Sequence, residues 1–318
     1  MKGAVAVYHC VTRTVNGEIW WDDVAKKVLR KQLWQVAEFC GVQVLTYCIM
    51  SNHFHVLVSV PEKEGADAAV TDSELLRRYQ VMYPNPRPHK QSRVEVLEQI
   101  LRDGGEDAEA LRSSLLSRMH DLGAFMHALK QRFSIWYNKR HGRFGTLWAE
   151  RYKSVLVQGE GSPLLTMALY IDLNPVRAGI VEDPKDYRFS GYAEAVAGKK
   201  PAKAGIGVII SSFMGQAKVQ AMSVYRKRLF GRGSTSGGGS DGARISRKKA
   251  LKVLQQQDGD LALHEVLRCK CSYFTDGAVI GLRDFVQAHM PSKKRQPKPA
   301  KHLGDLHVQK GINKPVFA

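Results

Sequence analysis

The feature that most constrains the fold is an apolar, β-branched run over residues 42–60 that a short polar turn interrupts near its middle. Two such segments joined by so short a turn predict antiparallel strands, here 42–50 and 53–60. Alternate side chains of a strand point to the same face, so His53 and His55 are expected on one side of the second strand.

Two histidines in this pattern are capable of metal chemistry. Their attachment points lie about 6–7 Å apart along a strand, and two neutral imidazoles at that spacing can converge on one divalent cation. The other interpretation is that His53 and His55 are partly exposed or hydrogen-bonded histidines without a metal. The tripeptide alone leaves both interpretations open.

The neighbouring sequence predicts further strands and helices. Helical periodicity and turn residues give the order strand, helix, strand, strand, helix, strand, helix. This order is that of the split βαβ, ferredoxin-like arrangement, so the expected fold class is α+β, an antiparallel sheet with helices on one face. The additional strands are expected at 4–12 and 148–157, and the helices at 22–40, 111–140 and 162–174.

Composition changes along the chain suggest several further parts. A polar insertion at about 61–110, with one helix around 73–83, interrupts a domain that otherwise spans residues 1–195. Beyond it we expect a mostly helical, basic C-terminal extension. Its parts are a helical segment at 196–230, a Gly/Ser-rich flexible linker at 231–243, a small helical DNA-binding-like module at 244–290 and a basic disordered tail at 291–318.

The charge balance indicates a polyanionic partner. The chain has 48 Lys and Arg against 30 Asp and Glu, a net charge of +18, and nucleic acid is the commonest polyanion. The 5 cysteines form no Cys-x-x-Cys pair, which favours reduced thiols in the cytoplasm. No run is long and apolar enough for a membrane span or a convincing signal peptide, so no membrane association is expected.

Basic and aromatic residues alternate between positions 126 and 154. Cations contact phosphates and aromatic faces stack on unpaired bases, a combination suited to single-stranded or hairpin DNA. Helical spacing nevertheless favours a core role for Phe133, Trp136 and Tyr137. The candidate DNA-binding residues are Lys130, Arg132, Lys139, Arg140, Arg143, Arg151, Lys153 and Arg177.

A second candidate for chemistry lies in the segment 169–179. Tyr170 and Asn174 are four residues apart and share one helix face. A tyrosine can attack phosphorus, and an asparagine oxygen can bind a metal. The alternative is that Tyr170 belongs to the core and Asn174 caps the helix before a proline. Tyr137 and Tyr152 are rival nucleophiles.

Taken together, these motifs resemble a known family over residues 4–192. His53-Phe54-His55, the segment Asn138–Trp148, Arg151-Tyr-Lys153 and the segment Tyr170–Gly179 occur in the order seen in single-tyrosine HUH transposases. The REP-associated tyrosine transposases of bacteria are the most similar branch. The resemblance implies the HUH endonuclease fold and a bacterial, cytoplasmic, nucleoid-associated protein.

The resemblance also implies a mechanism. His53, His55 and Asn174 would hold Mg²⁺ or Mn²⁺, with stronger support from Mn²⁺ because imidazole is a softer ligand than oxygen. Tyr170 would cut single-stranded DNA beside a REP-like hairpin through a 5′-phosphotyrosine intermediate and then transfer the strand. The alternatives are a domesticated DNA-binding protein without turnover and a structural or regulatory protein that associates through its basic tail. A monomer is favoured over a homodimer.

Overall fold

The computed structural model describes residues 5–84, 93–215, 221–233, 244–246, 250–251, 277–289, 301–303 and 306–310. The chain forms two compact units. The first comprises Met1–Ala6, Trp21–Gln43 and Ser59–Leu147, and the second comprises Val7–Trp20, Val44–Val58 and Trp148–Ala318.

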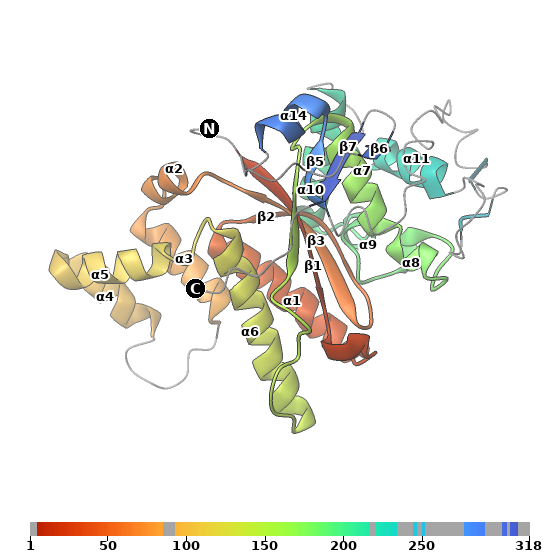
Figure 1. The fold of residues 1–318 in the computed structure, drawn as a ribbon. Coiled ribbons are helices and arrows are strands. Elements are labelled where there is room, and N and C mark those ends of the chain that lie inside the picture. The colour runs from red at the N-terminus through yellow and green to blue at the C-terminus, as the bar shows by residue number, and fades with distance from the viewer. Residues whose placement is uncertain are drawn as a thin grey trace. The chain divides into compact units, whose positions relative to one another are not determined.

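The second unit is built on an antiparallel sheet of the expected kind (Figure 1). Its first four strands have the order β2-β3-β1-β4. The predicted hairpin is confirmed, with the Met50 backbone N–H donating to the His53 carbonyl at 2.8 Å. The strands are β1 (Ala6–Arg13), β2 (Gln43–Ile49), β3 (His53–Val60) and β4 (Lys153–Val157). This order and the helices described below confirm the α+β fold class.

β4 is shorter than the predicted strand at 148–157. It begins at Lys153, and Trp148 makes only an isolated bridge to Thr14. Along its regular length β4 pairs antiparallel with β1, so that Leu156 lies opposite Tyr8. Between Trp148 and Lys153 the charged residues Glu150 and Arg151 interrupt the apolar alternation.

Three more strands extend the sheet beyond β4. β5 (Gly277–Gly281) is parallel to β4, and β7 (Leu306–Lys310) and β6 (Lys301–Leu303) follow it in the sheet. The prediction of a helical module at 244–290 is therefore wrong for residues 277–281, and only α14 (Arg283–Ala288) is helical within 277–289. The prediction of a disordered tail is wrong for the two strands after 300. Short apolar runs pair readily with an open strand edge. Residues 252–276 and most of the predicted linker lie outside the described residues.

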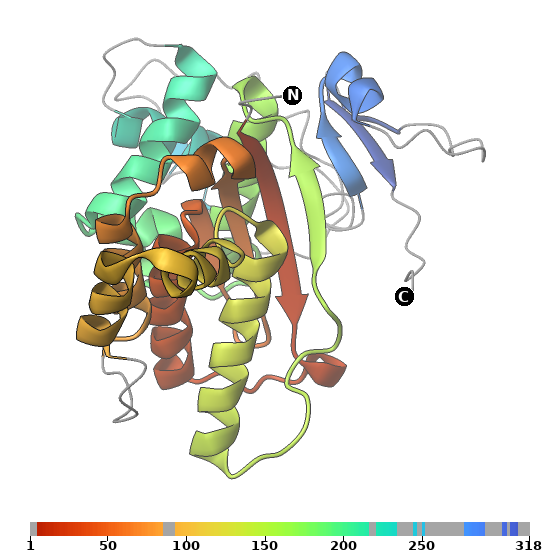
Figure 2. The ribbon, with the colours of Figure 1, turned by 90° about the vertical axis from the view of Figure 1, so that its left-hand side faces the viewer.

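Four helices of the second unit pack together against its sheet (Figure 2). Two of them, α10 and α11, lie at the position of the helical segment predicted at 196–230. Gly205 brings α10 so close to β2 that an added Cβ atom would lie 2.3 Å from the Leu45 carbonyl oxygen. The helices are α7 (Gly161–Asp172), α9 (Gly191–Val196), α10 (Lys200–Met214) and α11 (Ala221–Gly233).

α7 begins and ends earlier than predicted. Glu160, not Ser162, precedes its first turn, and Asp172 is its last residue. The chain then continues into the short helix α8 (Asn174–Arg177), which contains Pro175 in its first turn. A proline is tolerated there because the first turn of a helix needs no partner for its N–H groups.

The first unit consists of helices, of which α1 and α6 pack on each other. Asp22 caps α1 by accepting from the Ala25 N–H at 2.7 Å, and Gly41 ends α1 in the left-handed conformation, so the helix predicted at 22–40 is confirmed as Asp23–Cys40. The helices are α1 (Asp23–Cys40), α2 (Lys63–Ala68), α3 (Asp72–Met82), α4 (Val94–Asp103), α5 (Gly105–Leu116) and α6 (Leu122–His141).

The single helix predicted at 111–140 is wrong, because α5 ends at Leu116 and α6 starts at Leu122. His120 has a φ of 51° and turns the chain out of helical geometry. Asp121 then caps α6 by accepting from the Ala124 N–H at 2.7 Å. The apolar periodicity of residues 111–140 predicts one continuous helix, but the local cap at Asp121 starts a new one.

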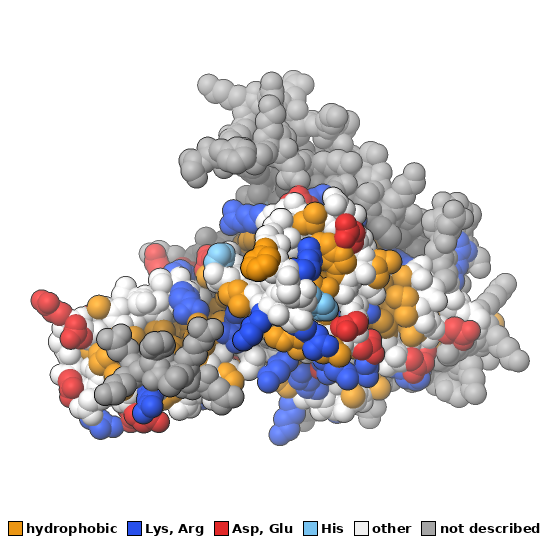
Figure 3. Space-filling model, turned by 90° about the horizontal axis from the view of Figure 1, so that it is seen from below, with side chains coloured by type: hydrophobic (Ala, Val, Ile, Leu, Met, Phe, Trp, Pro, Cys, Tyr) orange, Lys and Arg blue, Asp and Glu red, His pale blue; other side chains and the backbone are white. Residues whose placement is uncertain are grey.

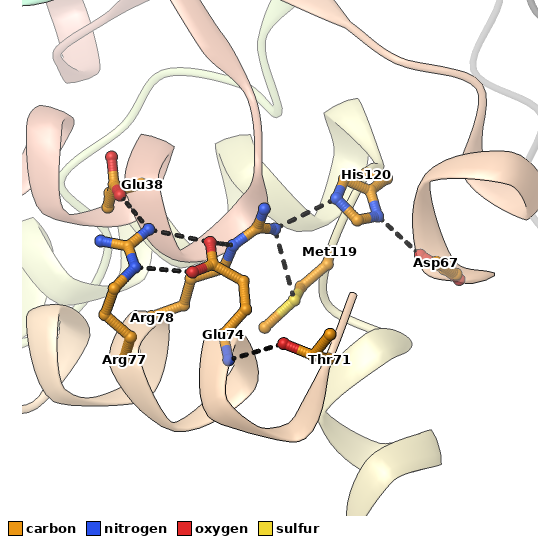
Figure 4. A network of polar contacts seen from close by, with 8 residues as sticks. All are labelled: Glu38, Asp67, Thr71, Glu74, Arg77, Arg78, Met119 and His120. Atoms are coloured by element: carbon orange, nitrogen blue, oxygen red, sulfur yellow. Dashed lines mark hydrogen bonds and ion pairs between the residues drawn. The ribbon is translucent and has the colours of Figure 1, made fainter. Parts of the chain in front are cut away.

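His120 also organises the insertion at 61–110, which is more helical than predicted. Its Nδ1 lies 2.6 Å from the Asp67 carboxylate, and its Nε2 lies 3.1 Å from the Arg78 guanidinium (Figure 4). Arg78 in turn donates to Glu74 at 2.7 Å. These contacts hold α2, α3 and the turn before α6 together, so this network has a structural role.

Two further findings concern the cysteines and the search for a membrane-spanning helix. Cys10, Cys40 and Cys48 are buried free thiols, whereas Cys269 and Cys271 lie outside the described residues. Within the part of the chain that the structure describes, no helix is long and apolar enough to cross a membrane.

Candidate active site

Three histidines lie together on the sheet of the second unit. His53 and His55 come from β3, and His9 comes from the neighbouring strand β1. The His53 and His55 ring centroids are 5.1 Å apart. The rings of His9 and His55 are nearly parallel with centroids 5.2 Å apart, and His9 Nε2 lies 3.0 Å from His55 Nδ1. The sequence prediction included His53 and His55 but missed His9.

Tyr170 faces these histidines from α7. Its ring centroid lies 5.7 Å from that of His55 and 6.1 Å from that of His9, edge-on in both cases. The guanidinium carbon of Arg177, from α8, lies 5.0 Å from the centre of the Tyr170 ring. Tyr170 is only 2% exposed, so the predicted nucleophile is packed against the histidines.

The two predicted ligand histidines are neutral at neutral pH. Burial, with a smaller contribution from Arg13, lowers the pKa of His53 to about 4. Burial also lowers the pKa of His55 well below its ordinary value, assisted by the positive charge of neighbouring groups. Neutral imidazole is the form that binds metals, since one ring nitrogen then carries an unprotonated lone pair.

A hydrogen bond identifies which nitrogen of His53 is available to a metal. His53 Nδ1 lies 2.7 Å from Asn52 Oδ1, an atom that can only accept. The Asn52 amide nitrogen donates to the Gly17 carbonyl at 2.7 Å, which fixes the orientation of the carboxamide. His53 therefore carries its proton on Nδ1, and Nε2 presents the lone pair.

Asn174 has a capping role at the end of α7. Its Nδ2 donates to the carbonyls of Tyr170 at 3.0 Å and Ile171 at 3.2 Å. This agrees with the capping interpretation, and it leaves Oδ1 as the polar atom suited to a cation. Among the described residues, no group of three or more His, Cys, Asp or Glu side chains is placed to hold a metal. Two imidazole nitrogens and an amide oxygen nonetheless fit a cation that completes its coordination with water or phosphate oxygens.

A buried carboxylate anchors α7 two residues after Tyr170. Asp172 is fully buried and accepts from the Thr46 hydroxyl at 2.9 Å and the Tyr225 hydroxyl at 2.5 Å. The Tyr192 N–H donates to it at 3.3 Å. Burial raises the pKa of Asp172 to about 7, against the opposing effect of these donors. The sequence prediction missed this anchor, although an aspartate within the apolar segment 164–173 was a usable signal.

The rival tyrosines have other aromatic and cationic neighbours. Tyr137 lies on α6 in the first unit, where it is buried and stacks on His141 at a centroid distance of 4.2 Å. Tyr152 lies just before β4, under the guanidinium of Arg151. Among the described tyrosines, Tyr170 is the one with ring contacts to both His9 and His55.

The candidate DNA-binding residues fall into both units. Five of them belong to α6 and the turn that follows it. Lys and Arg side chains gather on the face of the molecule seen in Figure 3. Arg140 lies over Trp136, and Arg132 lies over Tyr83, where burial lowers the pKa of its guanidinium. Arg132 is thus part of the packing of the first unit. The five are Lys130, Arg132, Lys139, Arg140 and Arg143, and the second unit contains Arg151, Lys153 and Arg177.

An exposed aromatic residue stands out in the turn after α6. Phe144 is 95% exposed. The turn is held by the Asn138 side chain, which donates to the Gly145 carbonyl at 2.9 Å, and by the Arg143 N–H, which donates to the Asn138 carbonyl at 2.9 Å. A fixed turn therefore presents an aromatic ring to solvent among basic residues. Of the three predicted core residues, Phe133 and Tyr137 are buried, whereas Trp136 is only half-buried.

Comparison with known proteins gives a family match over part of the chain. Residues 4–76 match the family model described as "Transposase IS200 like". Among solved structures, the chain is similar to the one described as "Structure of the REP associates tyrosine transposase bound to a REP hairpin", with 14% identity, coverage of 68% of this chain and 90% of that chain, and a TM-score of 0.38. No curated protein matches the chain.

The family match spans β1, α1, β2, β3, α2 and the start of α3. It includes His9, His53 and His55, and it ends before Tyr170. It confirms the resemblance to single-tyrosine HUH transposases that the sequence motifs indicate. The similarity of this chain to the IS200-like transposases is therefore established for residues 4–76.

Proposed function

We propose that this protein is a metal-dependent endonuclease and strand transferase that acts on single-stranded DNA beside a hairpin. The observation that carries the proposal is the position of the Tyr170 ring 5.7 Å from that of His55, a neutral histidine of the pair on β3. A phenol beside metal-capable imidazoles is the arrangement required for attack on a phosphodiester.

The proposed reaction exchanges one phosphoester bond for another. The Tyr170 oxygen attacks phosphorus, the bond from phosphorus to the 3′ oxygen breaks, and the phenolic proton is transferred in net terms to that leaving oxygen. The products are a 5′-phosphotyrosine link and a 3′-hydroxyl. Attack by a 3′-hydroxyl on the phosphotyrosine reverses the step and joins DNA without an external energy source.

The residues around Tyr170 have separate roles in this proposal. His53, His55 and Asn174 would hold Mg²⁺ or Mn²⁺, which would polarise the scissile phosphate when bound. Arg177, whose guanidinium lies 5.0 Å from the centre of the Tyr170 ring, would stabilise negative charge on the reacting phosphate. Asp172 and its hydroxyl donors keep α7 in place.

The choice of substrate rests on charge and on the exposed aromatic ring. The net charge of +18 and the basic end of α6 favour phosphates, and Phe144 offers a stacking surface for an unpaired base. The solved structure to which the chain is similar is described as bound to a REP hairpin. We therefore propose hairpin DNA with single-stranded arms as the substrate class.

A covalent-adduct assay tests the proposal. End-labelled hairpins with single-stranded arms, taken from DNA flanking the gene, are incubated with the full chain and Mn²⁺, Mg²⁺ or EDTA, then separated on a denaturing gel. We expect a metal-dependent protein–DNA band that Tyr170→Phe abolishes and that the matched controls Tyr137→Phe and Tyr152→Phe retain. Tight binding without an adduct in any metal would instead support a DNA-binding protein without turnover.

A further inference from the structure

His9 is a fully buried histidine in contact with the candidate metal ligand His55. It is 0% exposed, it lies on β1 beside β3, and its Nε2 is 3.0 Å from His55 Nδ1. One of these two nitrogens donates and the other accepts, because a hydrogen bond between two ring nitrogens holds a single proton. The direction of that bond determines which nitrogen of His55 keeps its lone pair.

The two possible directions have opposite consequences for metal binding. If His55 Nδ1 donates to His9, the lone pair of His55 lies on Nε2. If His9 donates instead, His55 carries its proton on Nε2, and that nitrogen is unable to bind a cation. Metal-binding histidines generally donate their second ring N–H to an acceptor, which fixes their tautomer and orientation.

The neighbouring histidine shows how the site resolves the same choice. His53 Nδ1 donates to Asn52 Oδ1 at 2.7 Å, so His53 presents Nε2. For one cation to bind both side chains in the same way, His55 must also present Nε2. His9 contacts Nδ1 of His55, just as Asn52 contacts Nδ1 of His53.

We propose that His9 is the positioning residue for His55, accepting a hydrogen bond from its Nδ1 so that Nε2 presents its lone pair to a divalent cation. The inference rests on the proposed function, because it assigns His55 to the metal. It adds a residue that does not itself touch the cation. The hydrogen bond between the nearly parallel rings, with an interplanar angle of 11°, also restricts rotation of the His55 imidazole.

Three substitutions separate this role from simple packing. His9→Phe keeps a ring of similar size against His55 and Tyr170 but removes the acceptor. His9→Gln keeps an acceptor in the form of an amide oxygen. His127→Phe, at an exposed position of α6, is the matched control for loss of a histidine. Circular dichroism and thermal melting verify that each variant is folded.

The first readout is the tautomer of His55 in the metal-free protein, read from long-range ¹H–¹⁵N NMR spectra. Its signals are assigned with His55→Gln. We expect the proton on Nδ1 in the unmodified chain, in His9→Gln and in His127→Phe. His9→Phe is expected to move it to Nε2. A proton on Nε2 in the unmodified chain, or no change in His9→Phe, would overturn the inference.

The second readout is the Kd for Mn²⁺, measured by electron paramagnetic resonance of the unbound ion. We expect His9→Phe to weaken binding by about 10–100-fold, the usual effect of losing a partner of a metal-bound histidine. His9→Gln is expected to restore most of the affinity. An unchanged Kd in a folded His9→Phe protein would contradict the inference. If the unmodified chain binds no Mn²⁺, the proposed function fails at its metal step, and the inference fails with it whatever the tautomer.

Discussion

Removing the Tyr225 hydroxyl tests whether α11 anchors the helix that carries the nucleophile. Tyr225 is fully buried, and its hydroxyl donates to Asp172 at 2.5 Å. Asp172 ends α7 two residues after Tyr170, so this hydrogen bond ties the C-terminal extension directly to the candidate active site. Tyr225→Phe deletes the donor and keeps the aromatic ring.

The size of the effect follows from the chemistry of the acceptor. At pH 8 the carboxylate of Asp172 is largely ionised, because its pKa is raised only to about 7. Loss of a buried hydrogen bond to a charged group costs roughly 1.5–3 kcal/mol, against roughly 0.5–1.5 kcal/mol for a bond to a neutral group. Tyr187→Phe is the matched control, since that buried hydroxyl donates to the neutral Ile49 carbonyl at 2.6 Å.

Urea unfolding at pH 8, followed by circular dichroism, measures both losses of unfolding free energy. We expect a larger loss in Tyr225→Phe than in Tyr187→Phe. A double-mutant cycle with Thr46→Val, which removes the other hydroxyl donor to Asp172, is expected to show coupling of about 0.5–3 kcal/mol. The reasoning is refuted if Tyr225→Phe costs no more than Tyr187→Phe.

Three further predictions address packing, acid stability and DNA binding. Gly205→Ala places a Cβ 2.3 Å from the Leu45 carbonyl oxygen and should destabilise the fold by about 1–3 kcal/mol or more, whereas Gly207→Ala, with nothing within 4 Å, should be neutral or stabilising in thermal melts. Hydrogen bonding from Arg77 lowers the pKa of Glu74 from its ordinary value of 4.5 to about 2. The ion pairs of Glu74 therefore stabilise the fold at pH values above 4.5, and this stabilisation is lost as the pH falls towards 2. Because the network is partly exposed, Glu74→Gln should lower the unfolding free energy in urea by only about 1 kcal/mol or less at pH 7. The loss should become smaller towards pH 2, and an equal loss at both pH values would contradict this prediction. Phe144→Ala should weaken binding to a hairpin with single-stranded arms by about 1–3 kcal/mol in fluorescence anisotropy, with little effect on a fully paired duplex, and Ile135→Ala, at another exposed apolar position, should change neither.

Much of the second unit was predictable because its signals are local. The turn between β2 and β3 and the two-residue alternation of His53 and His55 specify a hairpin with both imidazoles on one face. The helix α1 of the first unit was predicted for the same reason, from the helical periodicity of residues 22–40. Tyr170 was predicted from its spacing to Asn174 and from the motif around it, and the structure brings Tyr170 to the histidines.

The parts that were not predicted depend on contacts distant in sequence. The role of His9 arises from the pairing of β1 with β3, 46 residues apart, which no local pattern reveals. The Asp172 anchor needs Thr46 and Tyr225 from elements 126 and 53 residues away. The break at His120 was missed because the contacts to Asp67 and Arg78 favour a turn that helical periodicity alone does not indicate.

The most direct test of the central claim is to locate the covalent DNA link by mass spectrometry. The full chain is incubated with Mn²⁺ and a hairpin oligonucleotide with single-stranded arms, digested with nuclease and protease, and sequenced by tandem mass spectrometry. The account predicts a nucleotide-modified peptide with the phosphate on Tyr170 that is absent when EDTA replaces Mn²⁺. A modification on Tyr137 or Tyr152, or DNA cleavage without any modified tyrosine, would contradict it.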